Sequence, residues 1–313
     1  MCFPMVAPYN QALWEAIAQQ FEVRLVTSRL ASRQEIRWAD VVLIGDYARG
    51  IMPLNLLRAC RSRPRVVLWF DEWVGSGPAK DWVKRWLIRG VDSMIVCGGP
   101  QMGRLASLLG PQWTTWPVQY APYFAGVGPE YAPSHSYSRD FLFLGRLERE
   151  KGLDVLAQAM ALVPELPITI AGTGSLEAWV AGAFRDYPNV RLKLQWIDEH
   201  ERAQLLMSHG FLVLPSRFEA WGIVVNEALR AGLPAVVSNA VGSASELVLA
   251  SGAGSIFNVG DHRSLAYALQ QMQRLPDGEL REQRRRGWEV AKLRTLEVQA
   301  TALSRALTVY CES

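Results

Sequence analysis

Short runs of β-branched and aromatic residues recur along the chain, each followed by turn residues and an amphipathic stretch. Strands that alternate with helices form parallel sheets with helices on both faces. The pattern predicts an α/β protein with two doubly wound, Rossmann-like domains. The runs are EVRLVT (22–27), VVLI (41–44), RVVLW (65–69) and SMIVC (93–97), and then DFLFLG (140–145), LPITIAG (166–172), NVRLKL (189–194), FLVLP (211–215) and PAVVS (234–238).

A segment without periodicity separates the two series. GVGPEYAPSHSYSR (126–139) is rich in Gly, Pro and Ser, which is typical of a linker. The 313 residues also exceed the usual size of one hydrophobic core. We expect an N-terminal domain over 1–133, a second domain over 134–280, and a helix over 281–313 that packs back towards the first domain. Two such domains would face each other across a cleft lined by the carboxyl ends of their strands, where α/β sheets bind ligands.

Composition excludes several classes of protein. The net charge of +3 is small for this length, and basic residues alternate with acidic ones, which argues against a nucleic-acid surface. We interpret the arginines of REQRRR (281–286) as a solvated helix face. The four cysteines form no Cys-x-x-Cys pair, and no apolar run approaches the roughly 18 residues of a spanning helix. We therefore expect a cytoplasmic protein that is neither exported nor embedded in a membrane.

Two acidic residues flank a Trp-Gly turn in SRFEAWGIVVNEALRAGLP (216–234). Glu219 falls on the loop after the strand FLVLP, and Glu227 falls in the first turns of the following helix. The start of a helix favours a bound phosphate, and Gly222 lets a ligand approach the backbone. The carboxylates then suit hydroxyl groups on either side of the phosphates. Taken alone, the two acids fit solvated positions at a helix entry better than a binding site.

The stretch SRFEAWGIVVNEALRAGLPAVVS resembles the donor site of the retaining glycosyltransferases of family 4, in which two glutamates are separated by seven residues in the same setting. The resemblance implies a GT-B fold, with an acceptor-side domain over 1–133 and a donor-binding domain over 134–280. It also implies a nucleoside-diphosphate sugar as donor, and we expect this sugar to be UDP-linked. It assigns the hydroxyls of the donor sugar to Glu219 and the ribose to Glu227. The intervening residues of the donor site are Trp221, Gly222, Ile223 and Val224.

A second match to the same family is FLGRLEREKG (143–152), which follows the first strand of the second domain. In the family an Arg and a Lys at this spacing bind the donor diphosphate, so the resemblance assigns that role to Arg146 and Lys151. The alternative is a surface pair of cations. If the assignment holds, Arg146, Lys151 and Glu219 are the catalytic residues.

Two further loops match the family less fully. IAGTGSLE places Gly172 and Gly174 after a strand. Either the two glycines leave room for the nucleotide, or they form a tight turn that contacts no ligand. Glu177 stands where a dinucleotide fingerprint has its third glycine, which disfavours a dehydrogenase. VGSASELV resembles a Gly-Gly-x-x-Glu loop near the donor, except that Ser243 replaces the second glycine. Glu246 is thus a further donor-side candidate.

The chemistry implied by the resemblance expels a nucleoside diphosphate while positive charge grows on the anomeric carbon. The two cations and the helix start supply the stabilisation, and the departing phosphate takes the proton of the acceptor, with retention of configuration. The chain has no Asp-x-Asp, and its four histidines lack ligand spacing. We expect no cofactor and no metal requirement.

The resemblance is only architectural in the first half of the chain. MCFPMVAPYN has no glycine-rich loop, and Asn10 is interpreted as a helix cap. Asp71 and Glu72 follow a strand end and are either acceptor-side residues or a helix-capping cluster. KDWVKRWLIRG (80–90) has a Trp-rich face opposite basic residues, which fits either packing on the sheet or peripheral contact with the inner membrane surface.

The acceptor is therefore left open as a glycan, a lipid-linked molecule or a small molecule. Two alternatives to a glycosyltransferase stay in view. One is a sugar-nucleotide epimerase on the same architecture, which would need acid and base groups around the sugar. The other is a non-catalytic protein that binds nucleotide sugars.

Overall fold

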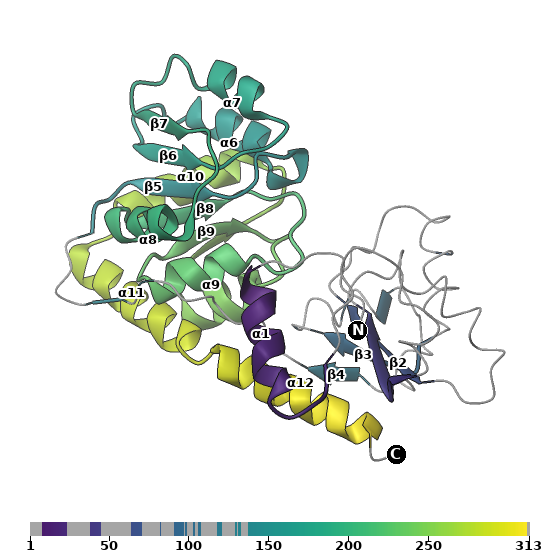
Figure 1. Ribbon diagram of the computed structural model, residues 1–313. Helices are drawn as coiled ribbons and strands as arrows, with labels where there is room; N and C mark the ends of the chain where they lie inside the picture. Colours follow the sequence, from purple (N-terminus) through teal and green to yellow (C-terminus); the bar gives the residue numbers. More distant parts are fainter. Residues whose placement is uncertain are drawn as a thin grey trace. The chain divides into compact units, whose positions relative to one another are not determined.

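The computed structural model describes residues 8–23, 38–44, 64–70, 91–96, 118–120 and 137–311, together with positions 82, 98, 103, 106, 107, 129, 131 and 132 (Figure 1). The chain divides into two compact units. Unit 1 comprises Met1–Phe124 and Thr295–Ser313, and unit 2 comprises Ala125–Arg294. The division after Phe124 comes just before the Gly-, Pro- and Ser-rich segment 126–139, where the boundary was expected at 133/134, and the final helical stretch is shared between the units.

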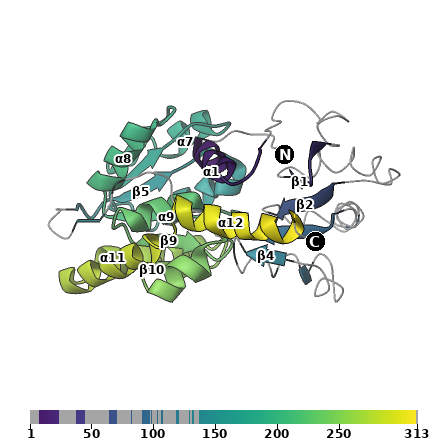
Figure 2. The same ribbon diagram turned by 60° about the horizontal axis from the view of Figure 1, so that its bottom comes forward.

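Unit 1 contains a parallel sheet with the strand order β1-β2-β3-β4. Helix α1 packs against α12, and α12 also contacts β1 and β4; the two helices lie side by side in both views (Figure 1, Figure 2). Because α1 begins at Pro8, Asn10 lies inside its first turn and does not cap it, which corrects that expectation. The elements are α1 (Pro8–Ala18), β1 (Val41–Ile44), β2 (Arg65–Phe70), β3 (Ser93–Val96), β4 (Val118–Tyr120) and α12 (Leu296–Cys311).

Unit 2 contains a second parallel sheet with the order β10-β9-β8-β5-β6-β7. The side chains of β5, β6, β8 and β9 are buried throughout, because helices cover both faces of a doubly wound sheet. Phe141 and Phe211 stack across β5 and β8 with ring centroids 4.9 Å apart. The strands are β5 (Phe141–Leu144), β6 (Ile168–Ala171), β7 (Val190–Lys193), β8 (Phe211–Leu214), β9 (Ala235–Ser238) and β10 (Gly254–Phe257).

The helices of unit 2 form two layers. Right-handed crossovers place α6 and α7 on one face of the sheet and α8 and α9 on the other. Helix α10 packs against α6, and α11 packs against α9 and η3. The helices are η2 (Arg149–Lys151), α6 (Leu153–Met160), α7 (Glu177–Ala183), α8 (Glu199–Ser208), α9 (Ile223–Arg230), η3 (Ala244–Leu249), α10 (His262–Gln273) and α11 (Asp277–Ala291).

The sequence 281–313 forms parts of two helices, where one was expected. Helix α11 ends at Ala291 within unit 2, and α12 begins at Leu296 within unit 1. The expectation of a solvated arginine face holds for Arg285, which is exposed, but not for Arg284, which is only 4% exposed. The Arg284 guanidinium donates to the carbonyl oxygens of Gly232 (3.0 Å) and Gly210 (3.3 Å). It therefore fastens α11 to the ends of α8 and α9.

Candidate functional site

The loops at the carboxyl edge of the unit 2 sheet carry Arg146, Lys151 and Glu219, and two of these residues, Lys151 and Glu219, are in contact. Strands β5 and β8 are neighbours, and the chain leaves them in opposite directions, to α6 on one face and α9 on the other. Such a switch point leaves a crevice at the strand ends, where α/β proteins bind ligands. The loops after β5 and β8 therefore form the centre of the site.

Lys151 and Glu219 form an ion pair between these two loops. The Lys151 Nζ donates to Glu219 Oε2, and the two side chains are 13% and 18% exposed. The backbone fixes this contact, because the amide of Arg217 donates to the Glu150 carbonyl at 2.7 Å. Gly152 has φ 68°, and a Cβ there would lie 2.0 Å from the Pro215 oxygen. The close approach of the two loops thus requires glycine.

Arg146 lies on the same loop but is directed elsewhere. Its side chain is 71% exposed and pairs with Glu150 at 3.1 Å. An exposed pair at i, i+4 contributes little stability, so the guanidinium can exchange this partner for a ligand at small cost. The structure thus brings Lys151 to Glu219 and places Arg146 on the surface of the loop.

The start of α9 follows directly after Glu219. Gly222 precedes the helix with φ 90°, and a Cβ there would lie 3.1 Å from Val241 Cγ1. Ile223 and Val224 are half-buried in the first turn. Trp221 is only 2% exposed and its Nε1 donates to Asn226 Oδ1 at 3.0 Å. Its ring is therefore part of the buried packing of unit 2 and does not present a surface to a ligand.

Glu227 is buried in α9 beside a cation from α8. Its Oε1 lies 3.3 Å from Arg202 Nη1, and its side chain is 9% exposed. Burial raises the pKa of the Glu227 carboxyl, and the nearby charge of Arg202 opposes this shift. A buried carboxylate that contacts one cation can still accept hydrogen bonds from a ligand.

Glu227 makes folding pH-dependent in a defined direction. In the unfolded chain a glutamate loses its proton near pH ~4.3. Because the folded pKa is raised, the native state keeps the proton above that pH. The free energy of unfolding therefore falls as pH rises from ~4.3 to the raised pKa, and is constant beyond it. We expect E227Q to lose less stability than the wild type on going from acid to neutral pH, as measured by urea unfolding.

The control for this measurement is E165Q, which changes an exposed glutamate that precedes β6. Its pH profile is expected to follow that of the wild type. If the E227Q and wild-type profiles run parallel, burial does not control the titration of Glu227.

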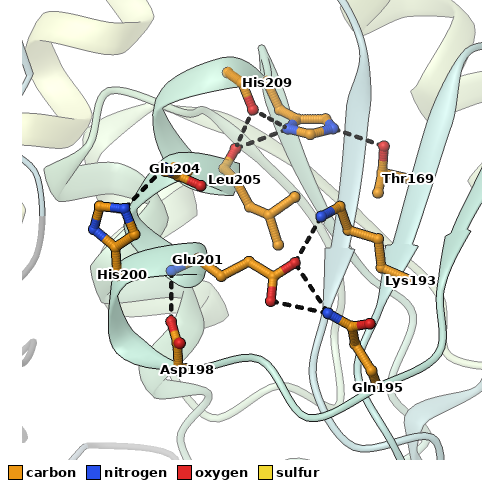
Figure 3. Close-up of polar contacts among 10 residues, drawn as sticks. Thr169, Lys193, Gln195, Asp198, His200, Glu201, Gln204, Leu205 and His209 are labelled. Atoms are coloured by element: carbon orange, nitrogen blue, oxygen red, sulfur yellow. Dashed lines mark hydrogen bonds and ion pairs between the residues drawn. The ribbon is translucent and has the colours of Figure 1, made fainter.

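Helix α8, which carries Arg202, is held by a polar network (Figure 3). The His209 ring nitrogens contact Thr169 Oγ1 and the Leu205 carbonyl, both at 2.7 Å, and burial lowers the pKa of His209. Glu201 accepts from Lys193 at 2.6 Å and from Gln195 at 3.2 Å. The network ties both ends of α8 to β6 and β7, and so fixes the position of Arg202.

Glu246 lies in η3 and pairs with Arg294 at 3.2 Å. The Arg294 guanidinium also lies 5.2 Å from the centroid of the Trp221 ring. Ser243, which replaces a glycine of the family pattern, is fully buried, and its amide donates to the Trp221 carbonyl. The residue that must be small is Gly242, where a Cβ would lie 1.9 Å from the Ala220 oxygen.

Gly172 and Gly174 allow two loops to pack together. A Cβ at Gly172 would lie 1.9 Å from the Gly145 oxygen, and one at Gly174 would lie 2.5 Å from the Leu147 oxygen. The Leu147 amide donates to the Thr173 carbonyl at 2.8 Å. This packing accounts for both glycines, and their place at a nucleotide stays a prediction.

Several of the remaining predictions concern residues outside the described part of the chain. Asp71 and Glu72 lie outside the described residues, and of 80–90 only Trp82 is described, with 66% exposure. Within the described ranges, no group of three or more His, Cys, Asp or Glu residues is arranged to hold a metal ion. A search of the same residues finds no helix with the length and apolar character needed to cross a membrane.

Arg202 and Arg294 were not singled out by the sequence. Each pairs with an expected site residue that lies far away along the chain, Glu227 and Glu246 respectively. Neither contact leaves a local pattern of spacing, so only the fold reveals these cations.

Comparisons with known proteins identify the family. Residues 133–287 match the family model described as glycosyl transferases group 1. The chain is similar to glycogen synthase of Mycobacterium tuberculosis, with 31% identity over 188 residues that cover 53% of this chain and 42% of the enzyme. Granule-bound starch synthase 1 of Pisum sativum is 31% identical over 104 residues, 32% of this chain and 17% of that protein. The chain thus spans less than half the length of these relatives.

Solved structures show the fold. Sucrose-phosphate synthase from Thermosynechococcus elongatus superposes with a TM-score of 0.73 at 18% identity, covering 88% of this chain and 74% of that one. The pneumococcal O-GlcNAc transferase GtfA gives 0.68 at 13% identity, covering 87% and 57%. Through residues 133–287 the chain belongs to the glycosyl transferases group 1, and it has the GT-B fold.

Proposed function

We propose that this protein is a glycosyltransferase that moves a sugar from a UDP-sugar to an acceptor hydroxyl, with retention of configuration and without a metal. The observation that carries the proposal is the Lys151–Glu219 ion pair, which lies beside the start of α9. A cation and a carboxylate in contact can each take one end of a sugar diphosphate. The segment that holds them is the part of the chain that matches the family.

In this proposal the donor replaces contacts that the free protein makes internally. Lys151 turns from Glu219 to the diphosphate, and Arg146 leaves Glu150 to join it. Glu219 then accepts hydrogen bonds from hydroxyls of the sugar. Glu227 accepts from the ribose, and the backbone around Gly222, Ile223 and Val224 faces the phosphates. Gly172, Gly174 and Glu246 complete the proposed donor site.

The proposed reaction breaks the bond between the anomeric carbon and the phosphate oxygen. The acceptor oxygen attacks on the same face, and the departing phosphate oxygen takes the acceptor proton. Cations stabilise the charge that develops on the leaving group, so Lys151 and Arg146 do the work that a divalent metal does at other phosphate sites. No enzyme nucleophile is needed in this scheme.

UDP is proposed as the nucleotide because two structures with this fold contain it. The GtfA structure holds UDP and GlcNAc. A structure of Staphylococcus aureus TarM, which superposes with a TM-score of 0.68 at 15% identity, holds Fondaparinux, alpha-GlcNAc-glycerol and UDP. The acceptor is a glycan, a lipid-linked molecule or a small molecule, with Asp71 and Glu72 as its proposed partners. Peripheral membrane contact through 80–90 belongs with the lipid-linked option.

The test is a calorimetric screen of UDP-, ADP- and GDP-sugars, followed by donor hydrolysis with and without EDTA. We expect one UDP-sugar to bind, to be hydrolysed slowly by the wild type, and to be unaffected by EDTA. Absence of binding by every nucleotide sugar contradicts the proposal. Loss of turnover in EDTA contradicts metal independence alone.

Two outcomes of the same screen favour the alternatives. A changed donor sugar after incubation without acceptor identifies an epimerase. Binding without hydrolysis, and without transfer to a broad panel of acceptors, identifies a non-catalytic binding protein.

A further inference from the structure

Unit 2 has a cavity of about 400 Å³ that no expected site residue lines. Its volume lies at the lower end of the range for small-molecule sites, roughly 300 to 1,000 Å³. We propose that it binds an anionic sugar, such as a hexose phosphate, as a second ligand separate from the donor. The residues that line it are Arg149, Asp154, Leu176, Trp179 and Arg217.

The charge of the lining indicates an anionic ligand. Arg217 pairs with Asp154, and the two side chains are 45% and 44% exposed. The side chain of Arg149 has no hydrogen-bond or ion-pair partner in the described part of the chain. The lining thus contains two arginines and one aspartate, a net charge of about +1. A phosphate or carboxylate on the ligand would balance the remaining charge with bidentate hydrogen bonds.

The apolar part of the lining indicates that the anion carries a ring. Trp179 is 42% exposed and Leu176 is half-buried, and both line the cavity. An indole face packs well on the C–H face of a sugar ring, while the polar edge of the ring keeps its hydroxyls in water. Inorganic phosphate alone would leave the indole exposed, and a neutral sugar would leave Arg149 unpaired. An anionic sugar satisfies both.

The cavity shares two loops with the Lys151–Glu219 pair. Arg149 lies two residues before Lys151, and Arg217 lies two residues before Glu219. The hydrogen bond from the Arg217 amide to the Glu150 carbonyl, at 2.7 Å, joins the loops between these positions. A ligand that holds Arg149 and Arg217 therefore acts on the same backbone that holds the ion pair. This coupling, unlike the binding itself, rests on the proposed function.

The binding test is calorimetry with glucose 6-phosphate, glucose, inorganic phosphate and uridine monophosphate. We expect glucose 6-phosphate to bind at least about tenfold more tightly than glucose or phosphate, since it makes both classes of contact. Trp179→Ala and Arg149→Met are each expected to weaken it about tenfold or more. Both side chains are at the surface, so the fold is retained, which circular dichroism verifies. Matched controls are Trp196→Ala and Arg185→Met, which change exposed residues outside the cavity.

Three outcomes overturn the binding proposal. They are no binding of glucose 6-phosphate to the wild type, equal losses in the control variants, and equal affinity for inorganic phosphate. A fourth outcome would place glucose 6-phosphate in the donor site and also overturn the proposal. In that outcome uridine monophosphate displaces glucose 6-phosphate, and K151A binds neither compound. Because UDP binding is measured separately, a failure here is distinct from a failure of the proposed function.

Coupling is tested by the affinity for UDP with and without glucose 6-phosphate. We expect a change of about fivefold or more in the wild type, which is the lower end of measured couplings. R149M is expected to lose that change while binding UDP normally. An affinity for UDP that glucose 6-phosphate leaves unaltered would overturn the coupling.

Discussion

Replacing Glu219 with glutamine, or Lys151 with alanine, is expected to lower kcat for the donor by about 100- to 1000-fold. The two side chains contact each other and are largely shielded from water. E219Q keeps the shape of the side chain but removes the charge that orders the sugar hydroxyls. K151A removes the cation that stabilises the leaving phosphate and leaves the Glu219 carboxylate to repel it. Steady-state kinetics with the donor found in the screen measure both effects.

The control for E219Q is E165Q, an exposed glutamate that precedes β6, which is expected to keep wild-type kinetics. Because Lys151 and Glu219 act as a unit, the double variant K151A/E219Q is expected to lose little more than either single variant. Wild-type kcat in both single variants would remove this pair from the catalytic site. Fully additive losses would show that the two residues act independently.

The stability of unit 2 is expected to depend strongly on Arg284. R284M should lower the free energy of unfolding by about 2–4 kcal/mol, because it leaves two buried carbonyl oxygens without donors. These belong to Gly232 and Gly210, at the ends of α9 and α8. The guanidinium also lies 4.1 Å from the centroid of the Tyr137 ring. Burial lowers the pKa of Arg284 to about 10, so the side chain is still charged at neutral pH.

Urea unfolding of R284M and R285M provides the comparison. Arg285 lies on the same helix but is exposed and pairs with Glu282 and Glu289. Exposed pairs contribute roughly 0–1 kcal/mol, so R285M should unfold close to the wild type. R284K is expected to lie between the two, because one ammonium group cannot reach both carbonyls with the geometry of a guanidinium. Equal midpoints for R284M and R285M would contradict the assignment.

The sequence predicts the strands of unit 2 well where they are buried on both faces. FLFL and FLVL are continuous apolar runs, and the structure places them in the middle of the sheet. Strand β10 was missed because GSIF has two apolar residues and lies at the sheet edge. It begins at Gly254, where φ is 138° and a Cβ would lie 2.0 Å from the Ala235 oxygen. A glycine in the sequence usually indicates a loop, but Gly254 is required here for the pairing of β10 with β9.

The sequence predicts only those residues of the candidate site that belong to local motifs. Lys151 and Glu219 belong to two such motifs, and the structure brings them into contact. Trp221 lies within the motif too, but its ring is buried, and Asn226, one turn into α9, accepts the hydrogen bond from its indole N–H. Arg202 and Arg284 were not identified because each finds its partners through packing of distant helices. No spacing along the chain encodes such contacts.

The last residue of unit 2 anchors the chain at the donor side. Arg294 holds Glu246 and lies over Trp221, and the following residue, Thr295, already belongs to unit 1. The polypeptide therefore leaves this unit from a fixed point and not from a slack linker. The residue before the crossing to unit 1 thus contacts both the loop after β8, through Trp221, and the segment after β9, through Glu246. A substitution of Arg294 would remove both contacts at once.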